Sequence, residues 1–246
     1  MKSSTTTRAR HGARYLLLLP LLALGACTTN VAEPTATATS VTALPTVRAA
    51  FHFESQPQQC DRPNNTTLSS VVRVATTDGS DASGVVIAYD RVLTAAHVVD
   101  DNPNALVYIN GSYRPARVMA RDLANDLALL SVNTQQLEPI RISSNHLFSA
   151  EPVWTVGFPL AMEQTANYGR YQQHVNGAIH SSASTNAGAS GGGLLRCASG
   201  AFELAGMIRG YGAYWDAGEL RRIEDLSISV PADTISNFAV SAGISL

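Results

Sequence analysis

Three side chains that are far apart in the sequence have the chemical types that nucleophilic catalysis by serine requires. Ser190 lies in a glycine-rich turn at residues 186–193, His97 follows a short apolar segment, and Asp126 precedes another. A serine hydroxyl needs a base to take its proton, a carboxylate to orient that base, and N–H donors to receive the developing oxyanion. The three residues therefore predict a Ser-His-Asp triad.

The turn around Ser190 would be weak support by itself, because glycine-rich turns are common. Glycines on both sides of the serine indicate a tightly bent backbone. The segment Gly-Ala-Ser-Gly-Gly at 188–192 also fits the Gly-x-Ser-x-Gly turn of α/β-hydrolases, in which the acid and the histidine follow the serine. Here His97 precedes Ser190 and no helices alternate with the predicted strands, so that fold is rejected.

The elements that must position these residues are short strands separated by turns. The Asn110-Gly111 pair is a strong hairpin signal, and Pro231 with Asp233 marks the start of a terminal helix. Many strands and almost no helix predict an all-β sandwich or a pair of barrels. The helix is expected at 232–240, and the strands at 71–75, 83–89, 91–94, 105–109, 113–120, 127–132, 152–157, 171–179, 194–197, 202–208 and 226–230.

The segments that hold the three residues resemble the three signatures of trypsin-like serine proteases. They read Thr-Ala-Ala-His at 94–97, Asp-Leu-Ala-Leu-Leu at 126–130 and Gly-Ala-Ser-Gly-Gly at 188–192, in the order that the family uses. The resemblance extends over about residues 65–240. It implies an all-β fold of two six-stranded antiparallel β-barrels with a short C-terminal helix. The protease domain is expected at 56–246, with barrels at about 65–135 and 140–232.

The resemblance also implies a role for each residue. Ser190 attacks the scissile carbonyl, His97 acts as general base and then as general acid, and Asp126 orients His97. The backbone N–H groups of Gly188 and Ser190 form the oxyanion hole. Such an enzyme hydrolyses polypeptides without a cofactor or metal, and the other histidines of the mature chain lack metal-site spacing. Because the base must be neutral, activity is expected to fall below roughly pH 6–7.

Three positions depart from the family pattern. Ala189 stands where digestive members carry an aspartate that pairs with the new amino terminus, Gly193 replaces a usual proline, and Arg209 is unusual at its strand edge. Bacterial proteases of the Deg or high-temperature-requirement type also lack that aspartate, and this domain looks more like theirs. The sequence given stops at Leu246, so we expect no PDZ domain after it.

The residues expected to line the first substrate pocket, by the same resemblance, are Ser184, Thr185, Arg209 and Tyr211. No carboxylate is present in the stretch 183–187 to pair with a substrate arginine or lysine, so a trypsin-type preference is not expected. Two preferences remain open, for small aliphatic residues or, if Arg209 points inward, for acidic residues.

The N-terminus predicts export. Basic residues precede an apolar run at 15–24 that is too short to span a bilayer, so residues 1–26 are interpreted as a signal peptide. Leu-Gly-Ala-Cys at 24–27 resembles a bacterial lipobox, which implies lipidation of Cys27; the alternative is an ordinary signal peptide. Thr28, rather than aspartate, favours the outer membrane by the same resemblance. The Thr/Ala-rich stretch that follows predicts a flexible tether over residues 27–55.

Charge and cysteine content limit the partners and the compartment. The leader holds four of the 17 Lys and Arg residues and none of the 19 Asp and Glu residues, so the rest carries a net charge of −6. No basic face for nucleic acid is expected. Cys60 and Cys197 in an exported domain predict a disulfide, with two unpaired thiols as the alternative.

Two functions follow from these features. The first is an exported serine endopeptidase, anchored by Cys27 to the bacterial envelope, facing the periplasm or the cell surface. The second is a catalytically silent lipoprotein of the same fold that binds peptides or an envelope partner. The presence of all three triad residues favours the enzyme. The sequence leaves the oligomeric state open.

Overall fold

Twelve strands and three α-helices make up the chain over residues 60–245, the part that the computed structural model describes. The predicted signal peptide (1–26), Cys27 and the predicted tether (27–55) lie outside these residues.

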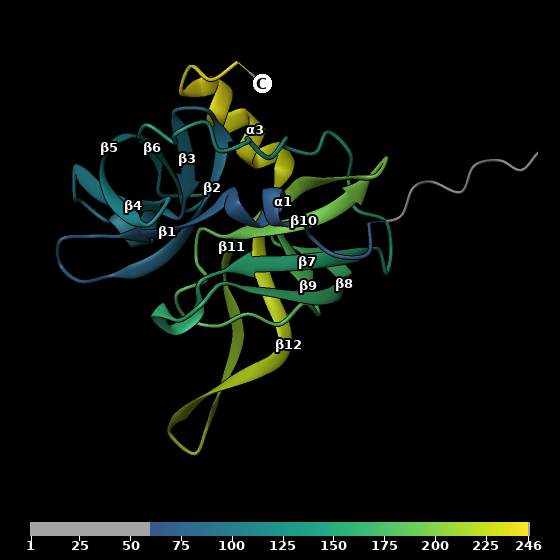
Figure 1. The fold of residues 1–246 in the computed structure, drawn as a ribbon. Coiled ribbons are helices and arrows are strands. Elements are labelled where there is room, and N and C mark those ends of the chain that lie inside the picture. Colours follow the sequence, from purple (N-terminus) through teal and green to yellow (C-terminus); the bar gives the residue numbers. More distant parts are fainter. Residues whose placement is uncertain (1–59, 246) are drawn as a thin grey trace, which may run out of the picture. The chain divides into compact units, whose positions relative to one another are not determined.

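The first six strands close into an antiparallel barrel (Figure 1) in the spatial order β1-β2-β3-β6-β5-β4. The Asn110-Gly111 hairpin is confirmed, since β4 pairs with β5 across it and both turn residues have positive φ, 48° and 83°. The strands are β1 (Val71–Ala75), β2 (Asp81–Ala88), β3 (Arg91–Thr94), β4 (Asn104–Ile109), β5 (Ser112–Asp122) and β6 (Leu127–Ser131).

The remaining six strands close into a second barrel, in the order β10-β11-β12-β9-β8-β7, which confirms the predicted fold. One predicted element is wrong: the single strand at 171–179 is a hairpin. Asn176 and Gly177 adopt positive φ, 51° and 78°, and turn the chain between β8 and β9. The strands are β7 (Pro152–Gly157), β8 (Thr165–Val175), β9 (Ala178–Ser181), β10 (Gly193–Ala198), β11 (Ala201–Asp216) and β12 (Glu219–Pro231).

The helices are short and lie at the edges of the barrels. The predicted terminal helix is α3 (Ala232–Ser241), which buries Ile235 and Phe238 and packs on β6, β11 and β12. No helix within residues 60–245 has the length and apolar character needed to cross a membrane. The other helical elements are α1 (Asn65–Ser69), α2 (Ala96–Val99) and a 3-10 turn, η1 (Pro159–Ala161).

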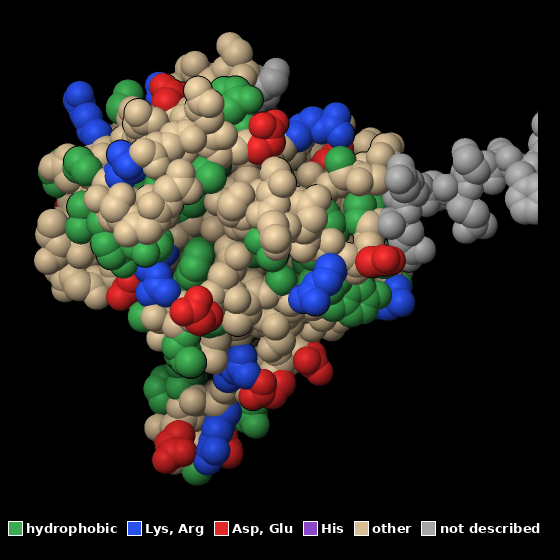
Figure 2. Space-filling model, viewed as in Figure 1, with side chains coloured by type: hydrophobic (Ala, Val, Ile, Leu, Met, Phe, Trp, Pro, Cys, Tyr) green, Lys and Arg blue, Asp and Glu red, His purple; other side chains and the backbone are tan. Residues whose placement is uncertain are grey.

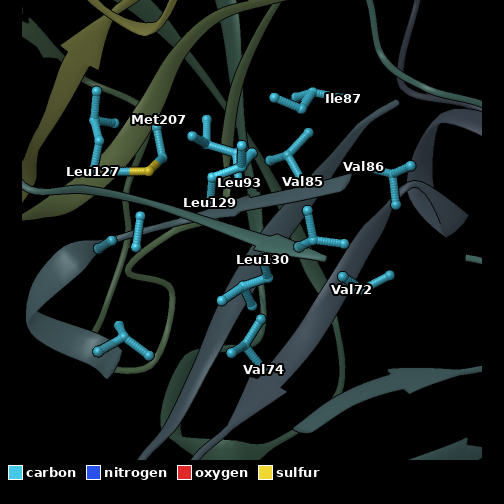
Figure 3. Close-up of a cluster of buried hydrophobic side chains, with 14 of the residues drawn as sticks. Val72, Val74, Val85, Val86, Ile87, Leu93, Leu127, Leu129, Leu130 and Met207 are labelled. Atoms are coloured by element: carbon cyan, nitrogen blue, oxygen red, sulfur yellow. The ribbon is translucent and has the colours of Figure 1, made fainter. Parts of the chain in front are cut away.

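One large hydrophobic cluster includes residues of both barrels, and a smaller cluster around Val153 and Leu194 lies within the second barrel. Leu93 and Leu129 fill the first barrel, and Met207 of β11 lies beside Leu127 of β6 in the same cluster (Figure 3). The segment between the barrels is bonded to both of them: the Ile140 N–H donates to the Val86 carbonyl at 2.9 Å, and the Leu204 N–H of β11 donates to the Arg141 carbonyl at 2.9 Å. Shared burial therefore fixes the seam between the barrels.

A two-stranded arm extends from the second barrel (Figure 1), where β11 and β12 continue beyond it. Figure 2 shows this arm as a projection that carries both hydrophobic and charged side chains. Trp215 faces Leu220 across the arm and both are exposed, by 73% and 57%. The sequence predicted a strand at 202–208 only, so the length of β11 is a finding of the structure.

Candidate active site

The three predicted catalytic residues come from three different elements of the structure. His97 lies in α2, directly after β3, and Asp126 lies in the turn that leads into β6. Ser190 lies in the turn at residues 186–193, called here the nucleophile turn, which leads into β10. The Ser83 N–H of β2 donates to the Ser190 carbonyl at 2.9 Å, so the first barrel is bonded directly to the nucleophile turn.

His97 and Asp126 form a tightly bonded pair. His97 Nδ1 lies 2.8 Å from Asp126 Oδ2 and 3.0 Å from Oδ1, and the His97 backbone N–H donates to Oδ1 at 2.9 Å. An ionised carboxylate only accepts hydrogen bonds, so Nδ1 of the neutral ring carries the proton. The other nitrogen, Nε2, therefore keeps the lone pair that a general base needs.

The electrostatic environment keeps Asp126 ionised. Its side chain is only 9% exposed, whereas that of His97 is 52% exposed. Burial opposes ionisation of the carboxyl, but the hydrogen bonds from His97, and the positive charges of the protonated His97 ring and of Arg209, outweigh it. The pKa of Asp126 therefore lies below its ordinary value. A charged Asp126 is suited to orienting the ring and stabilising an imidazolium.

The Ser190 hydroxyl is turned to the neighbouring strand. Its Oγ donates to the Arg209 carbonyl at 3.3 Å, and within residues 60–245 it makes no hydrogen bond to His97. Hydrogen bonds between nucleophile and base are often long or poorly aligned in unliganded sites and tighten when substrate binds. A rotation about χ1 moves the hydroxyl without moving the backbone.

The Arg209 side chain lies against the triad carboxylate. Its Nε is 3.6 Å from Asp126 Oδ2, and the side chain is half-exposed. A buried carboxylate attracts a nearby cation, which explains this orientation. The predicted preference for acidic substrate residues required Arg209 to point into the first pocket. The Arg209 side chain contacts Asp126 instead, so the structure does not support that preference.

The nucleophile turn requires glycine at two positions. Gly188 has φ +89°, and a Cβ there would lie 2.8 Å from the Phe158 carbonyl oxygen. Gly191 has φ +84°, and a Cβ there would lie 2.1 Å from the Ser83 carbonyl oxygen. Both the left-handed backbone and the close approach exclude other residues.

The two N–H groups predicted for the oxyanion hole, those of Gly188 and Ser190, are unpaired within the described chain. The Ala187 carbonyl accepts from the Leu160 N–H at 2.7 Å, and the Ala189 carbonyl accepts from the Gly192 N–H at 2.9 Å. Because N–H and C=O point in opposite directions in a trans peptide, the two N–H groups face away from these donors.

The predicted pocket residues do not all line one cavity. Ser184 and Thr185 line a hollow of about 320 Å³ beside the nucleophile turn, but Arg209 and Tyr211 do not. Tyr211 is half-buried on β11, opposite Ser227. Arg222 lines the hollow instead, donates to the Thr185 carbonyl, and pairs with Glu224.

Sequence reasoning missed Ser83 and Arg222, which both contact residues at or beside the nucleophile turn. Ser83 is a fully buried polar residue among the buried apolar residues of β2. Such a residue requires a hydrogen-bond partner. A serine among the apolar residues of a predicted strand is therefore the signal that could have pointed to Ser83. Nothing in the sequence around Arg222 predicts its partner.

Comparison with known families identifies the class of protein. The sequence model of the trypsin-like peptidase domain matches residues 82–206, about half of the chain. The chain belongs to this family and is by class a serine endopeptidase. No curated protein matches the sequence.

Solved structures confirm the fold. The active form of the Rv3671c protease from M. tuberculosis superposes with a TM-score of 0.63 at 20% identity, over 79% of this chain and 94% of that one. A serine endoprotease from Yersinia pestis superposes with a TM-score of 0.62 at 22% identity, over 73% of this chain and 67% of that one. The HtrA-type protease AlgW, solved with a tripeptide, superposes with a TM-score of 0.61 at 22% identity, over 72% of this chain and 62% of that one.

Proposed function

We propose that this protein is an exported serine endopeptidase of the bacterial envelope that cleaves polypeptides through Ser190, His97 and Asp126. The observation that carries the proposal is the His97–Asp126 pair, whose geometry leaves Nε2 as a base at the seam where Ser190 lies. Family membership and the unpaired N–H groups of the nucleophile turn support it.

The reaction follows from this arrangement. His97 Nε2 takes the Ser190 proton as Oγ bonds to the scissile carbonyl carbon, and the N–H groups of Gly188 and Ser190 receive the oxyanion. The imidazolium, held by Asp126, returns its proton to the leaving amine as the C–N bond breaks. Water then attacks the acyl-enzyme by the same route, which releases the acid and restores Ser190.

For the first pocket we propose a preference for small aliphatic side chains. Ser184 and Thr185 carry no charge, and the hollow beside them is lined by one cation, Arg222, and one carboxylate, Glu163, so it presents no net negative charge to a basic substrate side chain. Profiling with a peptide library is expected to show cleavage after small residues. Cleavage mainly after Arg or Lys would contradict this preference.

Envelope attachment rests on the lipobox-like segment at 24–27 and on the tether at 27–55. We propose an outer-membrane lipoprotein that faces the periplasm or the surface. Labelled palmitate is expected to enter the wild-type protein and not the Cys27→Ala variant in a bacterial host. Equal labelling of both proteins, or of neither, would contradict lipidation at Cys27.

Labelling with a fluorophosphonate probe tests the enzymatic function. The folded wild-type protein is expected to react, and the Ser190→Ala variant to be inert while it unfolds at the same urea concentration. Ser199→Ala, a second serine that precedes a glycine, is the matched control and should label like the wild type. Failure of the folded wild type to label or to cleave peptides would favour the silent, peptide-binding alternative.

A further inference from the structure

Ser83 makes two hydrogen bonds to the nucleophile turn and a third to Phe158. The Ser83 side chain is fully buried in β2 of the first barrel. The Phe158 N–H donates to Ser83 Oγ at 2.9 Å, and Ser83 Oγ donates to the Gly188 carbonyl at 2.9 Å. Its backbone N–H donates to the Ser190 carbonyl at 2.9 Å.

The direction of these bonds is determined by the available donors. The Phe158 N–H can only donate, so the single proton of the Ser83 hydroxyl is directed to the Gly188 carbonyl. Thr94 Oγ1 donates to the Ser83 carbonyl at 2.7 Å and fixes the strand behind it. Ser83 is thus held on both sides, and its hydroxyl is presented in one orientation.

The Gly188 carbonyl belongs to the peptide that follows the one carrying the Gly188 N–H, so a bond to it restricts rotation of Gly188 from the other side. A glycine at positive φ rotates more freely than any other residue, so the turn keeps its shape only if the neighbouring peptide groups are anchored. The Leu160 N–H anchors the Ala187–Gly188 peptide at 2.7 Å, and Ser83 Oγ anchors the next peptide through the Gly188 carbonyl. With both anchored, the Gly188 N–H faces away from Leu160, unpaired within residues 60–245.

The side chain of the residue before the nucleophile does not provide this restraint, although its backbone N–H donates to the Asn186 carbonyl at 3.1 Å. Ala189 is buried and carries no charge, so it forms no ion pair that could hold the turn. Space around the Ser83 hydroxyl is also limited, since a Cβ on Gly157 would lie 3.0 Å from Ser83 Oγ. The hydroxyl is the side-chain group that bridges the first barrel to Gly188.

We propose that Ser83 is a positioning residue that holds the Gly188 N–H in its oxyanion-binding orientation, so that the active site is formed without an ion pair to a newly cut amino terminus. The inference rests on the proposed function, because it assigns Gly188 to the oxyanion hole. Ser83 acts through Gly188 and does not touch the substrate.

Steady-state kinetics of Ser83→Ala test this role. Losing one oxyanion donor lowers kcat by about 10²–10³-fold, and a misplaced donor retains part of its effect, so kcat is expected to fall by about 10- to 100-fold. KM should stay within about twofold, because the oxyanion forms only in the transition state. Ser83→Cys keeps a weak donor and should give an intermediate kcat.

The matched control is Ser70→Ala, which removes another buried hydroxyl, one that bonds the backbone carbonyls of Thr66 and Glu138 beside the first barrel. It should lower stability without lowering kcat. A kcat within twofold of wild type in folded Ser83→Ala would overturn the proposal, and so would an equal kcat loss in Ser70→Ala.

Crystal structures of the wild type and Ser83→Ala keep the proposal testable if the protein proves inactive. The proposal expects the Ser83–Gly188 bond in the wild type and a rotated or disordered 187–188 peptide in the variant. An unchanged turn in Ser83→Ala would overturn it. Absence of any wild-type cleavage or labelling would instead refute the proposed function.

Discussion

At the scale of single residues, the site depends on a few side chains with fixed polarity. Asp126 accepts hydrogen bonds from both the ring and the backbone of His97, and so selects the tautomer with a free Nε2. Arg209 pairs with the same carboxylate from the opposite barrel. Replacement of Asp126 therefore tests the catalytic geometry directly.

Asp126→Asn is expected to lower kcat by about 10⁴-fold, with little change in KM. An amide that donates toward Nδ1 stabilises the tautomer with the proton on Nε2, which cannot act as base. Peptide hydrolysis under saturating and limiting substrate separates kcat from KM. A loss of less than tenfold would show that the carboxylate does not hold the base.

The pKa of Asp126 also makes its contribution to stability depend on pH. Its pKa in the folded protein lies below the ordinary 3.8, so the folded state favours the ionised form. The resulting stability is present above the unfolded pKa and is lost as the pH falls below about 4 through the folded pKa. The difference in unfolding free energy between wild type and Asp126→Asn should therefore shrink between pH 5 and pH 3. A constant difference in urea titrations would contradict this linkage.

At the scale of elements, the two halves of β11 lie in different environments. Its first half is buried between β10 and β12, and its second half forms one side of the exposed arm. The arm lacks a hydrophobic face against the barrels, and a two-stranded ribbon alone is only marginally stable. Its stability therefore derives from the barrel in which its strands begin.

Trp215→Ala in the arm should change the free energy of unfolding by less than about 0.5 kcal/mol, because the side chain is 73% exposed. Leu130→Ala in β6 should cost about 2–5 kcal/mol, because that side chain is fully buried. Urea unfolding of both variants gives the comparison. Similar losses would mean that the arm packs against the barrels in solution.

At the scale of the whole molecule, a disulfide joins the N-terminal end of the described domain to the second barrel. Cys60 and Cys197 are bonded across a sequence separation of 137 residues. The bond connects the segment before the first barrel to the end of β10 in the second. A long loop closed in this way restricts the unfolded chain more than the folded one.

Replacing both cysteines by alanine should lower the unfolding free energy by about 2–5 kcal/mol. The nucleophile turn is held by hydrogen bonds and not by the disulfide, so kcat of the folded variant should stay close to wild type. Measuring the unfolding free energy with and without a reductant tests the expected loss of stability. Equal stability of the oxidised wild type and the variant would contradict it.

The sequence alone determined the fold class and the three candidate catalytic residues, because strand alternation and short-range motifs are local properties. It predicted Asn110-Gly111 as a hairpin, but it missed the same pair at Asn176-Gly177, where strand-forming residues on both sides suggested one continuous strand.

The tertiary structure decided which distant groups meet. Ser83 and Gly188 are 105 residues apart, and only closure of both barrels brings the hydroxyl to that carbonyl. Arg209 could have pointed toward a pocket or toward Asp126, and the position of the buried carboxylate settled its direction. Local sequence fixes the chemical type of a side chain, but its partner depends on packing between strands far apart in the chain.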